Sequence, residues 1–180
     1  MIISFPFLRN SHNKMDNTLI VYASEHGTVE KCARELFELL DGKVDMCDLN
    51  QRSTFPDLSI YDAVIIGGSI HSGAIQQSIS DFCNTNIEFL RETTLGLFIT
   101  CMYSGEKADE QLKTAFPAEL SEKAVARDYF GGEIDKSKLS FWERIVTTQM
   151  MEKENLILHL SIDKIHRFAE KLKNNEKIEE

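Results

Sequence analysis

The chain has 180 residues, of which 42% are hydrophobic and 27% are charged, a balance typical of one folded domain and unlike a disordered chain. Its formal net charge is −9, which disfavours nucleic acid as a partner because the phosphates are also negative. The longest apolar runs, near 63–66 and 95–100, are much shorter than the roughly 20 residues that span a bilayer. No transmembrane segment is expected, and only peripheral contact with a membrane stays open.

The cysteines and the two ends of the chain bear on its location and its domain limits. The four cysteines lack the close pairing of a zinc site or a disulfide framework, which favours the reducing cytoplasm: Cys32, Cys47, Cys83 and Cys101. Residues 1–14 place apolar side chains ahead of the first charge, the reverse of a secretory signal. We interpret 1–14 as a disordered extension, 15–175 as a single domain with Met15 as a natural start, and 176–180 as a frayed tail.

Short apolar, β-rich runs alternate with amphipathic segments along the chain. Strands are predicted over 18–23, 43–49 (at an edge), 62–70, 95–102 and 123–130. Helices are predicted over 29–40, 77–90, 108–116 and 158–173, with an insert over about 134–155 before the last helix. Because parallel neighbours need crossover connections, this order predicts a three-layer α/β/α fold with a five-stranded parallel sheet. Ligands of such folds bind at the carboxyl ends of the strands.

The loop between the first strand and the first helix has the chemistry of a phosphate site. It comprises Ser24, Glu25, His26, Gly27, Thr28 and Val29. Backbone N–H groups and the helix dipole suit a phosphate monoester, two hydroxyls can donate to it, and the glycine lets the backbone curl around it. The absence of a P-loop lysine and of Gly-x-Gly-x-x-Gly argues against a nucleoside triphosphatase and a dinucleotide enzyme. The alternative is that Ser24 or Thr28 only caps the helix.

The run from Ile20 to Gly27, followed by Ala33 and Leu36, resembles the signature of the flavodoxin family. The resemblance implies a flavodoxin-like fold that binds FMN, with the phosphate on the loop over 24–29. Val29 stands where the family has a phosphate-binding threonine, and His26 stands where many members have another hydroxyl. Thr28 or His26 is therefore the expected substitute donor.

The same resemblance implies that two further loops hold the isoalloxazine ring of FMN. They comprise Ser69, Ile70, His71, Ser72 and Gly73 after the third strand, and Cys101, Met102, Tyr103, Ser104, Gly105 and Glu106 after the fourth. Tyr103 is the expected stacking partner of the ring. The alternatives are that Tyr103 covers an edge of the core and that His71 is an ordinary loop residue. Met102 fits a core position better than a cofactor contact, and Cys101 fits a structural thiol better than a nucleophile.

Two segments, 61–73 and 129–145, also resemble the menaquinone-dependent protoporphyrinogen dehydrogenases. This resemblance implies an FMN-dependent oxidoreductase of haem biosynthesis, with a porphyrinogen as substrate and a quinone or a redox protein as partner. The insert over 134–155 is then part of the substrate wall. No catalytic side chain and no metal ligand is assigned, because the flavin carries the chemistry.

Two alternatives to that enzyme remain. The first is a flavodoxin electron carrier that docks redox partners, favoured by Glu106 and the acidic composition, because negative charge near a flavin lowers its reduction potential. Members of the dehydrogenase group tend to be basic, which this chain is not. The second is a non-redox module such as a receiver domain, disfavoured because Ser24 and Ser69 stand where receivers need acidic residues.

Overall fold

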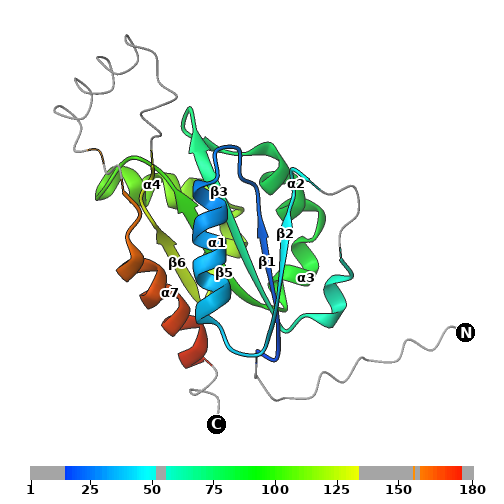
Figure 1. Cartoon of the computed structure of the whole chain (residues 1–180). Helices are drawn as coiled ribbons and strands as arrows, with labels where there is room; N and C mark the ends of the chain where they lie inside the picture. Colours follow the sequence, from blue (N-terminus) through cyan, green and yellow to red (C-terminus); the bar gives the residue numbers. More distant parts are fainter. Residues whose placement is uncertain (1–14, 52–55, 134–155, 157–158, 176–180) are drawn as a thin grey trace, which may run out of the picture.

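The computed structural model describes residues 15–51, 56–133, 156 and 159–175 of the chain. At its centre is a sheet of five parallel strands in the order β2-β1-β3-β5-β6 (Figure 1). The strands are β1 (Asn17–Tyr22), β2 (Lys43–Asp48), β3 (Ala63–His71), β5 (Thr94–Thr100) and β6 (Ala126–Tyr129). A short strand, β4 (Ala74–Ile75), pairs antiparallel with the end of β3. The predicted parallel sheet is confirmed, and β2 lies at its edge as expected.

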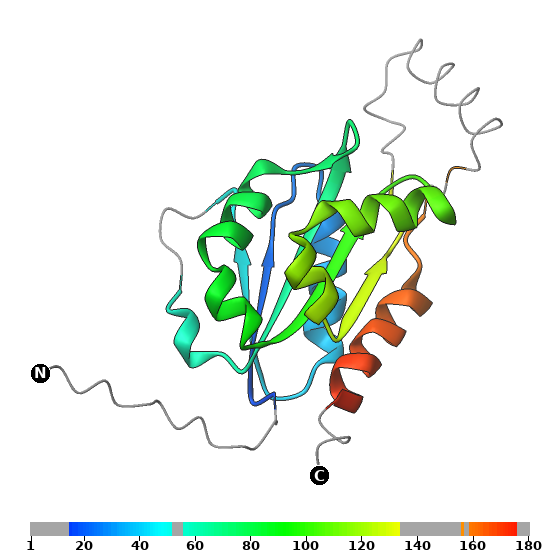
Figure 2. The ribbon, with the colours of Figure 1, turned by 180° about the vertical axis from the view of Figure 1, so that it is seen from behind.

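Helices cover both faces of this sheet, so the predicted three layers are also confirmed. On one face lie α1 (Thr28–Leu39) and α7 (Ile162–Asn175), drawn in front in Figure 1. On the other face, seen in Figure 2, lie α2 (Gln77–Thr85), α3 (Ile87–Arg91), α4 (Glu106–Ala115) and α5 (Ala118–Lys123). A short 3₁₀ turn, η1 (Leu58–Ile60), precedes β3.

The sheet separates two apolar cores because successive side chains of a strand point to opposite faces. Below α1 and α7, the ring of Phe98 stacks on Phe130 with centroids 4.8 Å apart, and Phe168 meets both rings edge-on. Gly67 on the neighbouring strand makes room for Phe98: a Cβ at this position would lie 1.9 Å from the ring. The glycine at position 67 of β3 is therefore required by the close approach of the Phe98 ring and not by a turn.

The helix predicted over 77–90 is divided at Asn86 into α2 and α3. The Asn86 backbone leaves helical geometry, at φ −111° and ψ 18°, and its side-chain amide donates to the carbonyl of Phe82 at 2.9 Å. Asparagine side chains compete in this way with the helical hydrogen bonds, which explains the break.

Two further boundaries differ from the prediction. The short helix α5 was not predicted; Pro117 directly precedes it, and six residues are too few for helical periodicity to show in the sequence. The last helix begins at Ile162 and not at 158, because the N–H of Ser161 donates to the carbonyl of Phe130 and Leu160 pairs with Gly131. The helical spacing of apolar residues over 160–172 would place Ile162 on the buried face, but it is 47% exposed in the first turn of α7.

The segment after the third strand also differs from the expected loop. Ser69, Ile70 and His71 continue β3, and a hairpin returns the chain through β4. Ser72 and Gly73 at its tip have φ angles of 51° and 84°. Positive φ at both central residues is typical of the tight turns that match the twist of antiparallel strands, so the pair closes a hairpin here.

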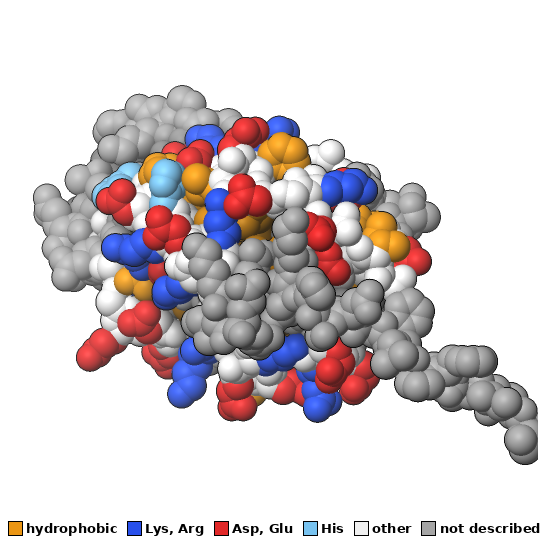
Figure 3. Space-filling view, turned by 90° about the horizontal axis from the view of Figure 1, so that it is seen from below, with side chains coloured by type: hydrophobic (Ala, Val, Ile, Leu, Met, Phe, Trp, Pro, Cys, Tyr) orange, Lys and Arg blue, Asp and Glu red, His pale blue; other side chains and the backbone are white. Residues whose placement is uncertain are grey.

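Three predicted segments, 1–14, 134–155 and 176–180, lie outside the described residues. Among the residues that the structure does describe, no helix combines the length and the apolar character needed to cross a membrane. The edge where the strands begin carries acidic and basic side chains side by side, as Figure 3 shows. Since ligands of parallel sheets bind at the carboxyl ends of the strands, we sought the candidate site at the opposite edge, where the strands end.

Candidate functional site

The three predicted binding segments meet at one edge of the sheet. The strands β1, β3 and β5 are neighbours and parallel, so the residues that follow them emerge together at the upper edge in Figure 1. The rings of His26 and His71 lie 6.2 Å apart, which places the loop over 24–29 beside the β3–β4 hairpin. Helix α4, which follows the loop over 101–106, packs against β4.

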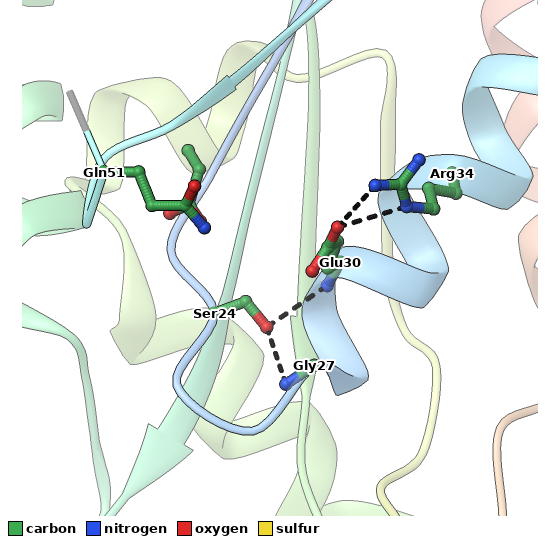
Figure 4. A network of polar contacts seen from close by, with 6 residues as sticks. Ser24, Gly27, Glu30, Arg34 and Gln51 are labelled. Atoms are coloured by element: carbon green, nitrogen blue, oxygen red, sulfur yellow. Dashed lines mark hydrogen bonds and ion pairs between the residues drawn. The ribbon is translucent and has the colours of Figure 1, made fainter.

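The loop over 24–29 leaves open space beside Gly27, where α1 begins. Gly27 caps α1 in a left-handed conformation, at φ 86°, and a Cβ placed there would meet nothing within 4 Å. The Ser24 hydroxyl accepts from the N–H groups of Gly27 at 3.1 Å and Glu30 at 3.3 Å (Figure 4). The proposed capping role of this serine is therefore present in the structure.

Four other N–H groups of this loop have no acceptor among the described residues: those of Glu25, His26, Thr28 and Val29. Two of them begin the first turn of α1, where the helix dipole also favours negative charge. Unsatisfied donors around an open space fit the oxygens of a phosphate monoester. The backbone half of the predicted cradle thus suits FMN.

Val29 contributes to this cradle only through its backbone. Its side chain is 1% exposed and packs with Ile20 and Ala33 in the core below α1. Thr28, the first residue of the helix, is half-buried, and His26 is exposed. The missing threonine hydroxyl at position 29 is thus replaced by an apolar side chain that stabilises the helix on the sheet.

Acidic side chains lie close to the start of α1. Glu30 accepts two hydrogen bonds from the Arg34 guanidinium, at 2.7 and 3.1 Å (Figure 4). Asp48, buried at the end of β2, accepts from the Gln51 amide at 2.8 Å. Burial, reinforced by the carboxylates of Glu30 and Asp48, raises the pKa of Tyr22. Because Arg34 is engaged with Glu30, a phosphate here depends chiefly on the N–H groups and the helix dipole.

Gln76, which the sequence analysis did not single out, links Ala23, just before the loop over 24–29, to Ser69 of β3. Its side-chain Oε1 accepts from the N–H of Ser69 at 2.7 Å. Its Nε2 donates to the carbonyl of Ala23 at 3.1 Å and to the Ser69 hydroxyl at 2.7 Å. The only sequence signal was its position just before a predicted helix, which does not reveal partners so far away along the chain.

The loop over 101–106 contributes an aromatic side chain, Tyr103, which a lysine of α4 covers. Tyr103 is half-buried against the core, and the Lys107 ammonium lies 3.6 Å from the centroid of its ring. The N–H of Gly105 donates to the hydroxyl of Tyr129 at 3.2 Å, which holds the loop against β6. Met102 is 37% exposed, so the expectation of a core position was wrong.

Cys101 is a structural thiol in this arrangement. It is 5% exposed, and its Sγ–H donates to the carbonyl of Tyr103 at 3.6 Å. Burial raises the pKa of Cys101, as it raises the pKa of both Cys32 and Cys83 to about 12. Since only the thiolate is a nucleophile, these groups are unreactive in the folded protein.

Thiol reactivity provides a first test of this geometry. All four cysteines are buried, so we expect less than about one thiol to react with Ellman's reagent near pH 8 in the native state, and all four in denaturant. The absorbance of released thionitrobenzoate measures the count. Rapid native reaction that disappears in Cys101→Ala would show that this thiol is exposed at the site and would contradict its structural role.

Comparison with known proteins supports the fold and indicates a family. A model of the flavodoxin domain matches residues 19–155 of the chain. No curated protein matches it. The chain is similar to the oxidised flavodoxin 1 of Bacillus cereus, at 16% identity and a TM-score of 0.53, over 88% of this chain and 97% of that one.

Two other solved structures share the fold. The flavodoxin, WrbA-like protein of Agrobacterium tumefaciens is 12% identical, with a TM-score of 0.57, over 92% of this chain and 99% of that one. The rubredoxin oxygen:oxidoreductase of Desulfovibrio gigas is 18% identical, with a TM-score of 0.51, over 93% of this chain but only 38% of that protein. The chain thus spans little more than a third of that oxidoreductase.

Proposed function

Since the chain belongs to the flavodoxin domain family, we propose that it binds FMN at the edge formed by 24–29, 69–73 and 101–106 and acts as a redox protein. The observation that carries the proposal is the set of N–H groups around Gly27 that have no acceptor in the described part of the chain. They lie at the start of α1, beside a hairpin and a loop that bear flat side chains. Backbone donors at a helix start suit the phosphate end of FMN.

Each of the three segments has a distinct part in this proposal. The N–H groups of 25–29 hold the phosphate, and the Ser24 hydroxyl, already bonded to Gly27, keeps the loop in shape. Tyr103 covers one side of the ring and shields it from water. The hairpin over 69–73 borders the other side. When bound, FMN supplies the one- and two-electron chemistry of its ring, and the chain supplies binding, orientation and electrostatics.

Titration of the full-length chain with FMN and with riboflavin tests this assignment. We expect quenching of flavin fluorescence with both ligands and an affinity for FMN about tenfold or more above that for riboflavin, since only FMN carries the phosphate. Inorganic phosphate should compete with FMN more than with riboflavin. If FMN leaves the fluorescence unchanged at micromolar protein, the proposal is wrong.

The specific activity that we propose is oxidation of a protoporphyrinogen with transfer of the electrons to a quinone. Its support is the resemblance of 61–73 and 129–145 to menaquinone-dependent protoporphyrinogen dehydrogenases. The first segment begins just after η1 and contains β3 and the tip of its hairpin, which lies beside the loop over 24–29. The second continues from β6 into the insert over 134–155, outside the described residues.

A low-potential electron carrier is the second candidate, and the charge of α4 favours it. Glu106, the last residue of the loop over 101–106, is exposed at the start of this helix with Asp109 and Glu110, so three carboxylates lie around the exposed Lys107. Such a surface suits a basic redox partner.

One anaerobic experiment separates the two candidates in a chain already shown to bind FMN. Protoporphyrinogen IX should bleach the flavin absorbance, and a menaquinone analogue should restore it, if the chain is the dehydrogenase. A carrier gives neither change, and its flavin is reduced instead by a protein donor in a manner that high salt suppresses.

A further inference from the structure

The hydrogen-bond ladder between β1 and β3 ends where the candidate site begins. Their last direct ladder bond runs from the N–H of Ala23 to the carbonyl of Gly67, at 3.3 Å. In a parallel ladder the evenly spaced bonds alternate between the two strands, so the next bond would join the N–H of Ser69 to the carbonyl of Ala23. That bond is replaced in the structure.

The side-chain amide of Gln76 occupies its place. The N–H of Ser69 donates to the Gln76 Oε1 at 2.7 Å, and the Gln76 Nε2 donates onward to the carbonyl of Ala23 at 3.1 Å. The planar side-chain amide thus replaces the direct backbone bond between Ser69 and Ala23. Because the amide lies between these two backbone groups, it holds the strands further apart than a direct bond would. Both backbone groups remain satisfied, which buried peptide groups require.

The space beside β3 is shaped for this amide. A Cβ at Gly68 would lie 2.7 Å from the Gln76 Oε1 and 2.8 Å from Ile75, so any larger residue there would displace the side chain. The same Nε2 donates to the Ser69 hydroxyl at 2.7 Å, and that hydroxyl lies 2.8 Å from the His71 Nε2. The amide is therefore fixed in orientation by the hairpin as well as by the strands.

We propose that Gln76 is a positioning residue that wedges β1 and β3 apart and so sets the distance between the phosphate loop and the ring-binding hairpin. This inference rests on the proposed binding of FMN. The wedge lies where Ala23 leads into the loop over 24–29 and Ser69 leads into the hairpin over 69–73. Without it, the ladder closes by one more bond and the two segments approach each other, which leaves less room for a flavin between them.

Substitutions at Gln76, matched by the same substitutions at its neighbour, test the wedge in the full-length chain. Gln77 is the first residue of α2, which Gln76 precedes; it is exposed and donates only to Asp81 at 2.8 Å among the interactions described. We expect Gln76→Leu to weaken FMN binding by about tenfold or more, the size expected when a buried carbonyl loses its donor. Gln77→Leu should stay within about threefold of wild type, as surface changes usually do.

Gln76→Glu adds a second measurement, the pH dependence of FMN affinity, which would not change if Gln76 only stabilised the fold. Near pH 8 the carboxylate can still accept from Ser69, but it has no proton to give to the carbonyl of Ala23. When that carboxyl is protonated near pH 5, it regains a donor, so the loss of FMN affinity relative to Gln77→Glu should shrink. His71, whose Nε2 lies 2.8 Å from the Ser69 hydroxyl, and the phosphate of FMN are present in both variants, so at each pH the comparison is between chains that differ only at positions 76 and 77.

A separate NMR measurement reports the wedge without any flavin. In Gln76→Leu, a through-hydrogen-bond coupling should join the nitrogen of Ser69 to the carbonyl carbon of Ala23, and in wild type it should be absent. The inference is overturned if wild type binds FMN while Gln76→Leu binds it equally well, or if the coupling is already present in wild type. Failure of wild type to bind FMN refutes instead the function proposed above.

Discussion

Replacing Phe98 with alanine is expected to lower the free energy of unfolding by about 3–5 kcal/mol, the usual range for a buried phenylalanine. The ring is fully buried in β5, stacks on Phe130 at 4.8 Å and meets the edge of Phe168 at 6.2 Å. Its removal leaves a cavity bounded by two rigid rings and the backbone of β3. Such a cavity collapses poorly, so the cost lies toward the upper end of the range.

Gly67 provides the matched test of this packing. Gly67→Ala should cost about 1–3 kcal/mol or more in the native background, because its Cβ would lie 1.9 Å from the Phe98 ring. In the Phe98→Ala background the same change should cost much less, since the clashing ring is gone. A double-mutant cycle by urea denaturation measures this coupling.

Phe37→Ala is the control for the loss of a phenyl ring. That side chain is 40% exposed on α1, and its removal should cost less than about 1 kcal/mol. Equal costs for Phe37→Ala and Phe98→Ala, or strict additivity of the Gly67 and Phe98 changes, would falsify this description of the core.

Replacing Gly27 with valine is expected to weaken FMN binding by about 5–30-fold, which corresponds to one or two kcal/mol. Gly27 has φ 86°, a conformation that is costly for a side chain branched at Cβ. Nothing lies within 4 Å of a Cβ there, so the cost comes from backbone strain and not from a clash. A loop that relaxes from this conformation changes the directions of its backbone N–H groups.

Two controls separate strain in the loop from general damage. Gly27→Asn should bind FMN better than Gly27→Val, because asparagine tolerates the left-handed region. Riboflavin, which lacks the phosphate, should lose much less affinity than FMN in Gly27→Val. Fluorescence titration measures all three. Equal losses for both flavins would mean that the loop does not hold the phosphate.

The main elements could be predicted from local patterns. Central strands buried on both faces have apolar runs, such as Ala63–Ile66, and the helix after 24–29 shows helical spacing of apolar residues. The glycine-containing turn over 24–29 could be predicted for the same reason, since Ser24 and Gly27 are only three residues apart in the chain. Segments shorter than two helical turns, such as α5, and the hairpin over 69–75 lack enough residues for a period to show.

Other features depend on residues that are distant along the chain. Nothing near position 76 indicates that this glutamine bonds to Ala23, 53 residues earlier. In the same way, Gly67 indicates a close approach but not that Phe98 is the neighbour. Val29 was assigned both to the apolar face of α1 and to the phosphate cradle, and only the packing of that helix shows its side chain in the core.

Taken by itself, the amino-acid order determined which segments become strands and helices, and that a glycine-containing turn precedes the first helix. These properties follow from periodicity and backbone preference within a few residues. Only the tertiary structure decided that the turn lies beside the β3–β4 hairpin, and that a glutamine amide separates the two strands leading to them. Hydrogen bonds and ring contacts between distant segments depend on how the strands pair, which no local pattern specifies.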